Sequence, residues 1–343
     1  MPPLLPHLRS ILDPQQGPFF ENGEAQYFLA FYRGKPAGRI SAHVNRLYDA
    51  FHDRLTGFFG FFECIREPKV AAALFRAASG WLRERGKTRL LGPLSFSVYD
   101  EVGMLVKGFD SPPVLFESHN PPYYPELMVG LDFRKSFDFH ALRVTERQID
   151  LAAMDREIAE ILQDQHLRLE RFNPRDLLRR RDEVFALFND AWSSNWGHVP
   201  FTARQFQTFF EDLKLLLRPN MVHFLLDQDR MVGFTIVVPD LNPLIKKLHG
   251  RLTWRGKLRL LYEARYKPLK RARCLVVGVQ QRYQRKRLHR ALILKSYADM
   301  VRETPCDFWD LSLVPENILF YLRFLKSYGA ESYKIFRIFE KEI

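Results

Sequence analysis

The same order of strand and helix patterns occurs in both halves of the chain, and this repeat constrains the fold most strongly. Each half has an apolar hairpin whose second strand starts with a small residue and a glycine, in Ala37–Arg39 and in Val232–Phe234. Each half then has a helix, and each ends in a long strand that follows a glycine-bearing helix end. We therefore expect an approximate duplication of the α/β (α+β) class, each copy being a mixed, largely antiparallel twisted sheet flanked by helices.

The chain of 343 residues is long for one hydrophobic core and suits two domains. We place the first domain at residues 1–145 and the second at residues 146–343, with Thr145–Asp155 as the connection. The second half is expected to open with a strand at His166–Phe172 and a helix that follows the turn at Asn173-Pro174.

Three observations bear on the class and location of the protein. The chain contains no run of 18 apolar residues of the kind that spans a membrane. Met1–Gln16 has proline and aspartate where a signal peptide needs an apolar core. Cys64, Cys274 and Cys306 are scattered and lack metal-ligand spacing, which is typical of reduced, buried thiols. We therefore expect a cytoplasmic protein without a metal site.

The positive charge is concentrated in two stretches of the second half. The net charge is +12, but Lys246–Arg273 holds eleven Lys/Arg and one acid, Glu263. Arg282–Arg290 adds five Lys/Arg and no acid, so the two stretches sum to +10 plus +5, or +15, and the rest of the chain carries about −3. Such a local charge predicts a local partner: a phosphate, an acidic protein or a membrane surface.

A strand, a turn, a basic loop and a helix follow one another in the second half. The apolar run Cys274–Gly278 leads into "VQQRYQRKRLHRAL", Val279–Leu292, and then into a helical pattern. This order presents backbone N–H groups to a phosphate at the start of the helix. Phosphate loops usually carry glycines because the backbone must approach the phosphate closely. Here the expected glycine positions hold Arg287 and His289.

This segment resembles the acyl-donor motif of the GNAT superfamily, the Gcn5-related acyl-CoA N-acyltransferases. In that family the first strand splays from its neighbour, and a following loop of the pattern Q/R-x-x-G-x-G/A binds the pyrophosphate of coenzyme A. Gln284–His289 aligns with this pattern. Gln284 matches its first position, and both glycines are absent.

The segment from Asn317 to Gly329 resembles a second motif of the superfamily, in which a tyrosine often serves as general acid. At the corresponding spacing this chain has Phe324-Leu325. That acid is therefore not carried over, and Tyr321, one turn earlier, is a weak substitute.

Further motifs narrow the resemblance and cover nearly the whole chain. They are "GRISAHVN", "GFFGFFE", "GPLSFSVYDEVG", "GFDSPP", "NPPYY", "PDLN" and "YKIFRIFEK". Together they resemble a bacterial family of tandem GNAT-like proteins that includes the bacterial ceramide synthases and the YghO-like proteins. The resemblance implies N-acylation of an amine, such as a sphingoid base, by a fatty acyl thioester. The co-substrate would be acyl-CoA or an acyl carrier protein, with no permanently bound cofactor.

The predicted donor site combines backbone and side-chain groups. Backbone N–H groups on the splayed strand can hold the carbonyl oxygen of the thioester. Basic side chains of the loop can replace the lost backbone contacts to the pyrophosphate by charge-assisted hydrogen bonds. The alternative is a solvated basic helix start without a ligand. The predicted donor-binding residues are Val277, Gly278, Val279, Arg282, Gln284, Arg285, Lys286, Arg287 and Asn317.

The general base has three candidates, and each has a structural role as its alternative. Glu63 ends the most apolar strand of the first half, and Asp240 ends the equivalent strand of the second half. His198 lies in "SSNWGHVP", a loop of polar and aromatic residues. A carboxylate or an imidazole in such a place can take the proton of an attacking amine.

The predicted acceptor site lies in the irregular segment 99–125, because a loop of this length inside a compact domain is usually functional. Asp100 and Glu101 can bind a cationic amine, or they can cap a turn. The motif "NPPYY" can line a pocket or form a turn that packs on the sheet, through Asn120, Tyr123 and Tyr124.

The stretch 244–273 mixes its basic residues with leucines and aromatic residues. A basic amphipathic stretch of this kind suits contact with a membrane surface, which would place the protein at the inner face of the membrane. It equally suits an acidic acyl carrier protein, and a plain solvated face is a further alternative. Nucleic acid is disfavoured, because the chain has no nucleic-acid-binding motif.

Three functions remain in competition at this point. The first is a tandem GNAT-like N-acyltransferase that uses a long-chain acyl thioester. The second is a non-catalytic binding protein of the same fold, with a degenerate loop that binds anionic lipid or an acidic partner. Acyl-thioester turnover separates these two. The third is aminoacyl transfer from tRNA, which salt-sensitive tRNA binding would support.

Overall fold

The computed structural model describes residues 5–145, 150–163, 166–171, 179–214, 216–218, 221–267, 270–303 and 306–343. The strands are β1 (Gly23–Tyr32), β2 (Lys35–Asn45), β3 (Thr56–Cys64), β4 (Arg89–Gly92), β5 (Met104–Lys107), β6 (Arg134–Val144), β7 (Leu167–Arg171), β8 (Val222–Asp227), β9 (Arg230–Pro239), β10 (Arg271–Val279), β11 (Phe308–Pro315) and β12 (Glu331–Glu342). The helices are α1 (Leu5–Leu12), η1 (Pro18–Glu21), α2 (Arg46–Phe51), α3 (Pro68–Arg83), α4 (Tyr124–Gly130), α5 (Leu151–Ile161), α7 (Arg181–Ala191), α8 (Ala203–Lys214), α9 (Asn242–Lys247), α10 (Trp254–Tyr266), η3 (Gln281–Lys286), α11 (Leu288–Glu303) and α12 (Leu319–Ser327).

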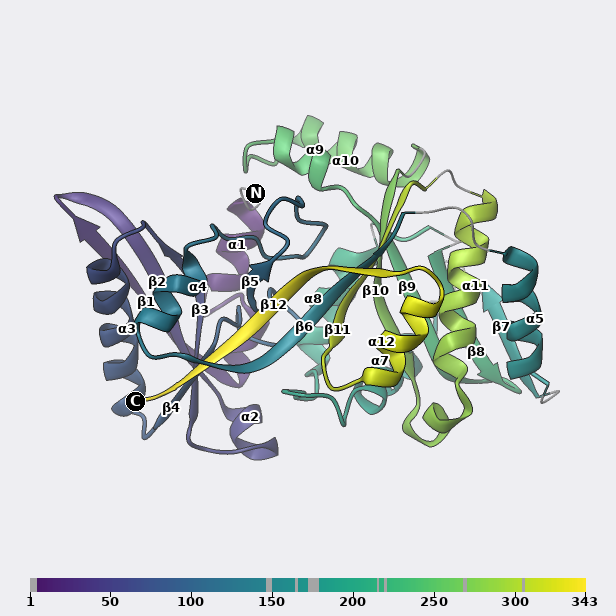
Figure 1. Cartoon of the computed structure of the whole chain (residues 1–343), viewed down its shortest axis with the longest axis horizontal. Helices are drawn as coiled ribbons and strands as arrows, with labels where there is room; N and C mark the ends of the chain where they lie inside the picture. The colour runs from purple at the N-terminus through teal and green to yellow at the C-terminus, as the bar shows by residue number, and fades with distance from the viewer. Residues whose placement is uncertain are drawn as a thin grey trace.

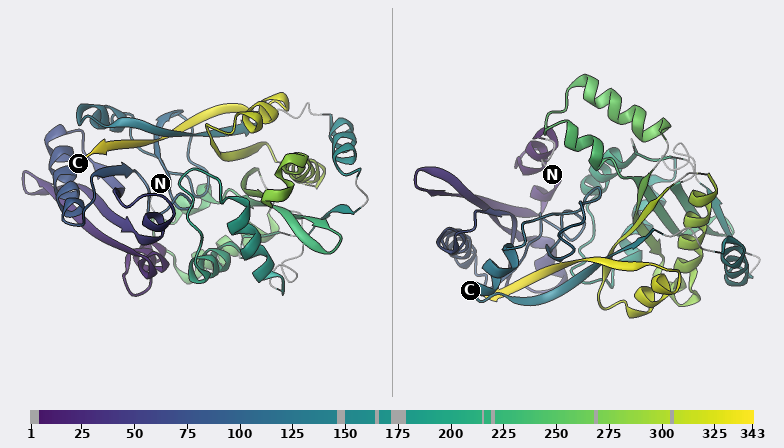
Figure 2. Two further views of the ribbon diagram at one scale, coloured as in Figure 1. Left: turned by 90° about the horizontal axis from the view of Figure 1, so that it is seen from below. Right: turned by 45° about the horizontal axis from the view of Figure 1, so that its top comes forward.

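The described strands form one continuous twisted sheet that runs the length of the molecule (Figure 1). Its order is β1-β2-β3-β4-β12-β6-β11-β10-β9-β8-β7, and β5 pairs with β12. Neighbours are mostly antiparallel, whereas β3–β4 and β10–β11 are parallel pairs. Helices flank the sheet in the views of Figure 2. The predicted α/β class, with a mixed and largely antiparallel sheet, is confirmed.

At the centre of the sheet, the last strand of each half pairs with a strand of the other half. β6 closes the first half in sequence but pairs with β11 of the second half. β12 closes the second half but pairs with β4 of the first. β6 and β12 also pair with each other, as the long teal and yellow ribbons of Figure 1 show. The division at residue 145 stays a prediction, and the sheet itself is continuous across it.

Two predictions about local structure were wrong. Thr145–Asp155 was expected to be a connection, but α5 begins at Leu151 within it. The Asp150 side chain accepts hydrogen bonds from the amides of Ala152 and Ala153, at 2.9 and 3.0 Å, and so caps the helix. The segment 99–125, expected to be irregular, contains the short strand β5. The predicted turn at Asn173-Pro174 lies outside the described residues.

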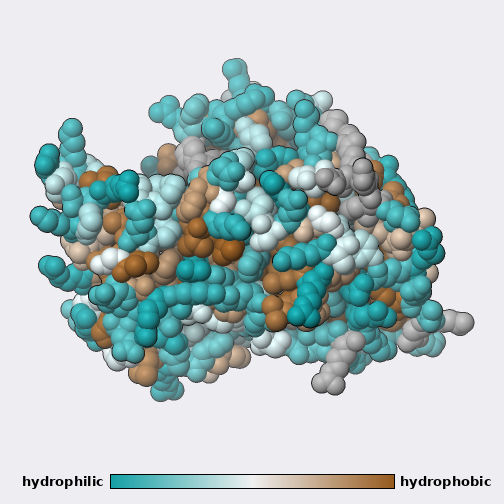
Figure 3. All heavy atoms as spheres, viewed as in Figure 1, coloured by the Kyte–Doolittle hydropathy of each residue, from teal (hydrophilic) through white to brown (hydrophobic). Residues whose placement is uncertain are grey.

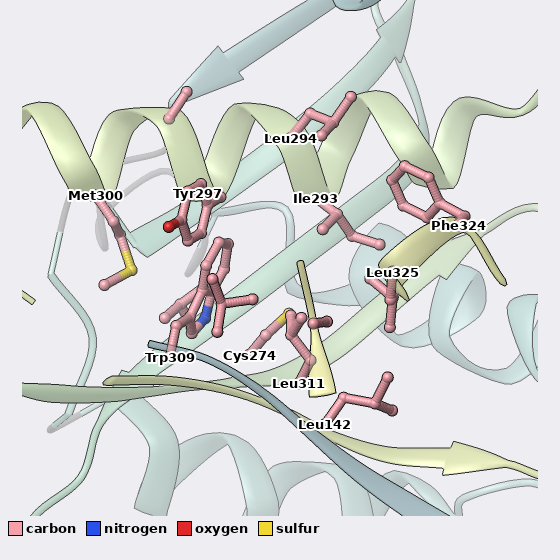
Figure 4. Close-up of a cluster of buried hydrophobic side chains, with 14 of the residues drawn as sticks. Leu142, Cys274, Ile293, Leu294, Tyr297, Met300, Trp309, Leu311, Phe324 and Leu325 are labelled. Carbon is pink, nitrogen blue, oxygen red and sulfur yellow. The ribbon is translucent and has the colours of Figure 1, made fainter. Parts of the chain in front are cut away.

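α11 packs along β10 and β11 and fixes the place where the basic loop ends (Figure 4). Its buried face includes Leu294, Tyr297 and Ala298, which have helical spacing. The Tyr297 ring stacks on Trp309 of β11 with ring centroids 4.4 Å apart. Because this face is buried against two neighbouring strands, the first turn of α11 is held next to the end of β10.

A buried lysine ties the C-terminal strand to the loop between β5 and α4. The side chains of Lys334 and Glu117 are both fully buried and form an ion pair. The Lys334 ammonium also donates to the carbonyl oxygen of Pro112, at 3.0 Å. A buried charge is stable only when it is paired and hydrogen-bonded. Lys334 therefore determines where residues 112–117 lie.

We predict that Lys334→Ala lowers the free energy of unfolding by about 3–5 kcal/mol, because it leaves the Glu117 carboxylate buried without its partner. Urea unfolding followed by circular dichroism measures this loss. The exposed Lys326→Ala is the matched control and should change stability by less than about 0.5 kcal/mol. The double variant Lys334→Met/Glu117→Met should recover most of the loss. A Lys334→Ala loss no larger than that of the control would contradict the assignment.

Candidate active site

The strands β10 and β11 diverge in the middle of the sheet. Their parallel pairing covers Arg271–Arg273, whereas the antiparallel pairing of β10 with β9 continues to Val279. A bulge interrupts the β9–β10 register between Cys274 and Val276 and changes the direction of β10 at this point. The edge of β10 beyond Arg273 therefore turns away from β11 and leaves an opening in the sheet.

A cavity of about 310 Å³ occupies this opening. Both halves of the chain line it. The first half contributes Val98, Tyr99, Asp100, Val102, Phe116 and Phe139. The second half contributes aromatic side chains from 188–209, the β10 residues from Arg273 to Val279, and parts of β11, α11 and α12. A largely apolar and aromatic lining of this kind suits a hydrophobic ligand.

The basic loop lies at the open end of β10, between that strand and α11. The last residue before α11 is Arg287, whose backbone is in the left-handed region with φ of 57°. This is the conformation that glycine adopts most easily, and Arg287 stands at the first glycine position of the predicted loop. α11 has no acidic residue of its own in its first turn, and Arg290 of that turn pairs with Glu157 of α5. The backbone shape of a phosphate loop is thus kept without glycine.

Two glutamines hold the basic loop against α7, Gln284 through its side chain and Gln281 through its backbone amide. The Gln284 amide nitrogen Nε2 donates to the carbonyl oxygens of Val279 and Ala191, at 3.1 and 3.0 Å. The backbone amide of Gln281 donates to Asp190 Oδ2 at 2.8 Å. Gln284 therefore shapes the loop through backbone contacts, and it also lines the cavity.

The basic loop presents exposed cations beside the start of α11. Arg282, Lys286 and Arg287 are exposed. The Arg282 guanidinium and the Lys286 ammonium lie over the ring of Tyr283, at 4.9 and 5.7 Å from its centroid. The side chain of Arg285 lies outside the described residues. The exposed cations stand around the start of α11, where an anionic group of a donor would be attracted.

The corresponding opening of the first half is filled by its own chain. The parallel pairing of β3 with β4 also ends early, at Phe58. Beyond it, the amide of Leu94 donates to the carbonyl oxygen of Phe59 at 2.8 Å. A Cβ added at Gly60 would lie 2.0 Å from the carbonyl oxygen of Leu94, so the loop lies directly on the strand. No room for a thioester is left beside β3.

The helix that follows β3 has a closed N-terminus. The Glu67 side chain caps α3 by accepting a hydrogen bond from the amide of Lys69 at 3.3 Å. Pro68 occupies the first turn and has no N–H to offer. A carboxylate at this place excludes an anionic ligand. The open strand and the open helix start therefore occur together in the second half.

Tyr99 and His198 form a hydrogen-bonded pair at the wall of the cavity. Tyr99 lines the cavity, and its hydroxyl contacts Nδ1 of the buried His198. Burial lowers the pKa of His198 and raises the pKa of Tyr99, so both side chains are neutral near pH 7. The backbone oxygen of His198 contacts Nε2 of His52 at 2.6 Å. The predicted base His198 thus reaches the cavity through Tyr99.

Asp100 supplies a carboxylate among the described residues that line the cavity. The hydroxyl of Ser97 donates to Asp100 Oδ2 at 2.7 Å. Removal of water by the surrounding protein raises the pKa of Asp100 to about 6. Glu101, its neighbour in the chain, is exposed and is not part of the lining.

Tyr321 and His289 meet at the α12 side of the cavity and both line it. Their ring centroids are 5.7 Å apart. Burial raises the pKa of Tyr321 well above its ordinary value, so the hydroxyl keeps its proton. Burial, with a smaller effect of Arg290, lowers the pKa of His289 to about 4. Motif spacing alone ranked Tyr321 as a weak substitute, because its place one turn early does not reveal that α12 turns it inward.

Several other predicted residues lie away from the cavity, and their described contacts are structural. Asp240 is 1 % exposed and pairs with Arg271 at 2.9 Å. Glu63 accepts a hydrogen bond from the Tyr124 hydroxyl at 2.6 Å. The remaining members of this group are Tyr123, which donates to the Cys64 carbonyl, Asn120, which bonds to both backbone groups of Leu105, and Asn317, which is exposed in the turn before α12.

Two features, a membrane-spanning helix and a metal-binding group of side chains, are absent from the part of the chain that the structure describes. No helix among them is both long and apolar enough to cross a bilayer. No three or more side chains of His, Cys, Asp or Glu among them are grouped so that they could hold a metal ion.

Comparison with known proteins places the chain among bacterial relatives of similar length. The protein named "Bacterial ceramide synthase" of Caulobacter vibrioides is 32% identical, over 99% of this chain and 90% of that protein. The protein named "Protein YghO" of Escherichia coli is 28% identical, over 93% of this chain and 82% of that protein. No family model matches the chain.

Solved structures show the same fold at low sequence identity. A tandem GNAT protein from the clavulanic acid biosynthesis pathway matches with a TM-score of 0.53 and 10% identity, over 94% of this chain and 83% of that one. A GCN5-related glucosamine N-acetyltransferase region of a fungal multi-domain β-N-acetylglucosaminidase matches with a TM-score of 0.56 and 13% identity. That match covers 94% of this chain and 34% of the fungal one.

The diverging strands and the start of α11 therefore lie in a fold like that of the tandem GNAT protein. The chain belongs to the family of the bacterial ceramide synthase and YghO. The resemblance inferred from its motifs is confirmed.

We predict that Arg287→Gly is more stable than Arg287→Ala by about 0.5–1 kcal/mol. Glycine removes left-handed strain of about 1–2 kcal/mol, which is partly offset by its greater freedom in the unfolded chain. Urea unfolding of the two variants measures the difference. At Arg302, in the last turn of α11, the same pair should have the opposite order, by about 1 kcal/mol. Equal stability of the two Arg287 variants would contradict the left-handed conformation.

Proposed function

We propose that the protein transfers a fatty acyl group from acyl-CoA to the amino group of a long-chain amine of the sphingoid type. One observation carries this proposal: an apolar, aromatic-lined cavity at the divergence of β10 and β11 opens beside a basic helix start. The name of the Caulobacter relative supports the acceptor, because a ceramide is an N-acylated sphingoid base. The apolar lining suits the acyl chain, and the basic loop suits an anionic donor.

The proposed reaction converts a thioester and an amine into an amide and a free thiol. The amine nitrogen attacks the thioester carbonyl carbon, a C–N bond forms, and the C–S bond breaks. The ammonium loses one proton before attack, and the amide nitrogen loses a second. One proton goes to the leaving thiolate, and the other goes to solvent. The protein has to hold the acyl oxygen, supply a proton to sulfur and accept one from nitrogen.

The donor is proposed to lie along the open edge of β10. Successive N–H groups of a strand point to opposite edges, and the Gln280 amide donates to the Val232 carbonyl of β9. The N–H groups of Val277 and Val279 therefore face the open edge and would hold the carbonyl oxygen as it becomes negative, whereas the Gly278 N–H faces β9. Arg282, Lys286 and Arg287 would neutralise the pyrophosphate through charge-assisted hydrogen bonds, and Arg285 and Asn317 remain predicted members of this group. An acyl carrier protein is the second candidate donor, because its phosphopantetheine carries the same thioester and a phosphate.

Tyr321 is proposed to donate the proton to the leaving thiolate. It lines the cavity at the α12 side, and its raised pKa means that it is protonated at neutral pH. A neutral hydroxyl in an apolar wall is a suitable general acid for a thiolate that forms within reach. This role follows the general acid of the superfamily at a position one turn earlier than its usual spacing.

The acceptor amine is proposed to enter on the side of Tyr99 and Asp100. The Asp100 carboxylate can pair with the ammonium group, and Glu101 remains a predicted second contact at the rim. The Tyr99 hydroxyl, held by His198, can accept a hydrogen bond from the amine and pass its proton toward the imidazole. His198 is then a positioning residue that acts through Tyr99. The structural contacts of Asp240 and Glu63 favour neither as the base.

Product formation with purified protein tests the proposed function. Palmitoyl-CoA and sphinganine are supplied, the amide is detected by mass spectrometry, and free thiol is measured with a chromogenic disulfide. A parallel reaction with palmitoyl carrier protein distinguishes the two donors. Amide formation with matching thiol release supports the proposal. Binding of palmitoyl-CoA without turnover of either donor would instead support the non-catalytic binding protein.

We predict that Tyr321→Phe lowers kcat by about 100-fold, the usual loss when a general acid is removed, with little change in KM. Steady-state kinetics with palmitoyl-CoA measure both constants. Tyr328→Phe is the matched control, since Tyr328 lies about two turns further along, directly after α12, and bonds to Glu157 away from the cavity lining. Its kcat should remain within about two-fold of the unmodified protein. Equal losses in the two variants would count against the assignment of Tyr321.

A further inference from the structure

One face of α10 carries a straight stripe of large apolar and aromatic side chains that point into solvent. Trp254, Leu258, Tyr262 and Tyr266 are 69, 57, 57 and 72 % exposed. They follow one another at intervals of four residues, which places them along one side of the helix. Over these residues the stripe is about 18 Å long. Single exposed apolar residues are common on soluble proteins, but a continuous row of four is a sign of an interaction surface.

The opposite face of α10 holds the helix on the body of the protein. Gly256 and Ala264 are buried there, and Leu260 is partly buried in the same core as α7 and α8. The Arg218 guanidinium donates to the carbonyl oxygens of Glu263 and Lys267, at 3.1 and 2.8 Å, and so caps the end of the helix. The helix is therefore formed before any partner arrives, and the stripe is presented without a cost of folding.

Positive side chains border the stripe. Exposed bases of the same region are Lys246, Lys247, Arg251, Arg255, Lys257, Arg259 and Lys267. The acid Glu263 is paired with Arg259 at 3.0 Å and with Lys267 at 3.6 Å. α9 and α10 form the upper edge of the molecule in Figure 1 and in the right view of Figure 2, and this edge is largely hydrophilic in Figure 3. The surface thus combines an apolar row with an excess of positive charge.

We propose that α10 docks the protein on an anionic lipid bilayer, with the stripe in the headgroup region and the bases on lipid phosphates. Tryptophan and tyrosine are suited to this depth, because their rings are apolar and their polar ends stay hydrated. The surrounding bases complement the negative surface. A second copy of this chain is disfavoured as the occupant, because it would bring the same positive charges together.

The docking surface connects to the cavity through the loop that Lys334 holds. The Asn242 side chain at the start of α9 donates to the carbonyl oxygen of Pro113 at 2.9 Å. Phe116, three residues further along the chain, is 45 % exposed and lines the cavity. The benefit of docking rests on the proposed function, because a long-chain amine resides in the bilayer and would enter the cavity from there. The docking itself does not depend on catalysis.

Vesicle flotation tests the proposal with the full chain and does not require activity. Vesicles of phosphatidylcholine alone are compared with vesicles that also contain phosphatidylglycerol, at two salt concentrations. Three variants are used: Trp254→Ala/Leu258→Ala/Tyr262→Ala, the charge variant Arg255→Glu/Lys257→Glu, and the control Leu29→Ala/Phe31→Ala. The control removes two side chains that are 68 and 63 % exposed on β1, at the other end of the sheet.

The unmodified protein should float with anionic vesicles and lose this binding at high salt. The stripe and charge variants should each bind about ten-fold more weakly or worse, whereas the control should bind as the unmodified protein does. The stripe variant should keep its turnover of a short, water-soluble amine, which separates a failure of docking from a failure of the proposed reaction.

Three results would overturn the proposal. The first is unmodified protein that does not float with anionic vesicles. The second is a β1 control that loses as much binding as the stripe variant. The third is vesicle binding that survives the α10 changes while binding of an acylated carrier protein is lost, which would assign the surface to an acidic protein instead.

Discussion

The divergence of β10 from β11 after Arg273 is the constraint on which the rest of the site depends. A continuous pair of strands would satisfy its backbone groups internally and leave no space between them. Because β10 bulges at Cys274 and turns away, one stretch of its edge faces a cavity instead of a neighbouring strand. α11 then starts directly beyond that edge, after the basic loop. The proposed thioester donor needs an oxyanion site and an anion site, and one local change in strand direction places the open edge of β10 beside the basic loop.

The two halves supply different parts of this site. In the first half, the loop after β4 lies on β3, and Glu67 closes the start of α3, so the same architecture holds no donor. That loop instead projects Tyr99 and Asp100 into the cavity of the second half. The pairing of β6 and β12 with strands of the other half makes this possible, because it joins the halves into one sheet. The described residues that line the cavity therefore come from both halves.

The sequence predicted the parts of the structure that depend on local pattern. The hairpins, the helix on each half and the loop at Gln284–His289 all follow from periodicity, turn residues and charge. The pairing of β6 and β12 with strands of the other half could not be predicted in this way, because two apolar terminal strands of similar length can pair with either partner, and tertiary packing makes the choice. α5 was missed although Asp150 and the spacing of Leu151, Met154 and Ile158 indicate a capped amphipathic helix.

The candidate site was harder to predict than the fold, because the direction of a side chain depends on packing. Asp240 ends the expected strand, yet its carboxylate pairs with Arg271 and faces the protein interior. Tyr321 has the wrong spacing for the motif, yet it lines the cavity. His198 was singled out from its loop, but its connection to the cavity runs through Tyr99, a residue that sequence reasoning did not select. The sequence did not indicate that the Arg287 backbone is left-handed, except that Arg287 occupies a position where the motif has glycine.

Photolabelling with a diazirine-bearing fatty acyl-CoA tests the central claim most directly, because it reports where the acyl thioester lies on the unmodified chain. Labelled peptides are identified by mass spectrometry, with an excess of unlabelled palmitoyl-CoA as the competitor. We predict competed label in the aromatic segment 188–209 and in β10 between Cys274 and Val279. Competed label on β3, between Thr56 and Cys64, with none on β10, would contradict this placement of the donor, because it would put the donor in the half that Glu67 and the loop after β4 close.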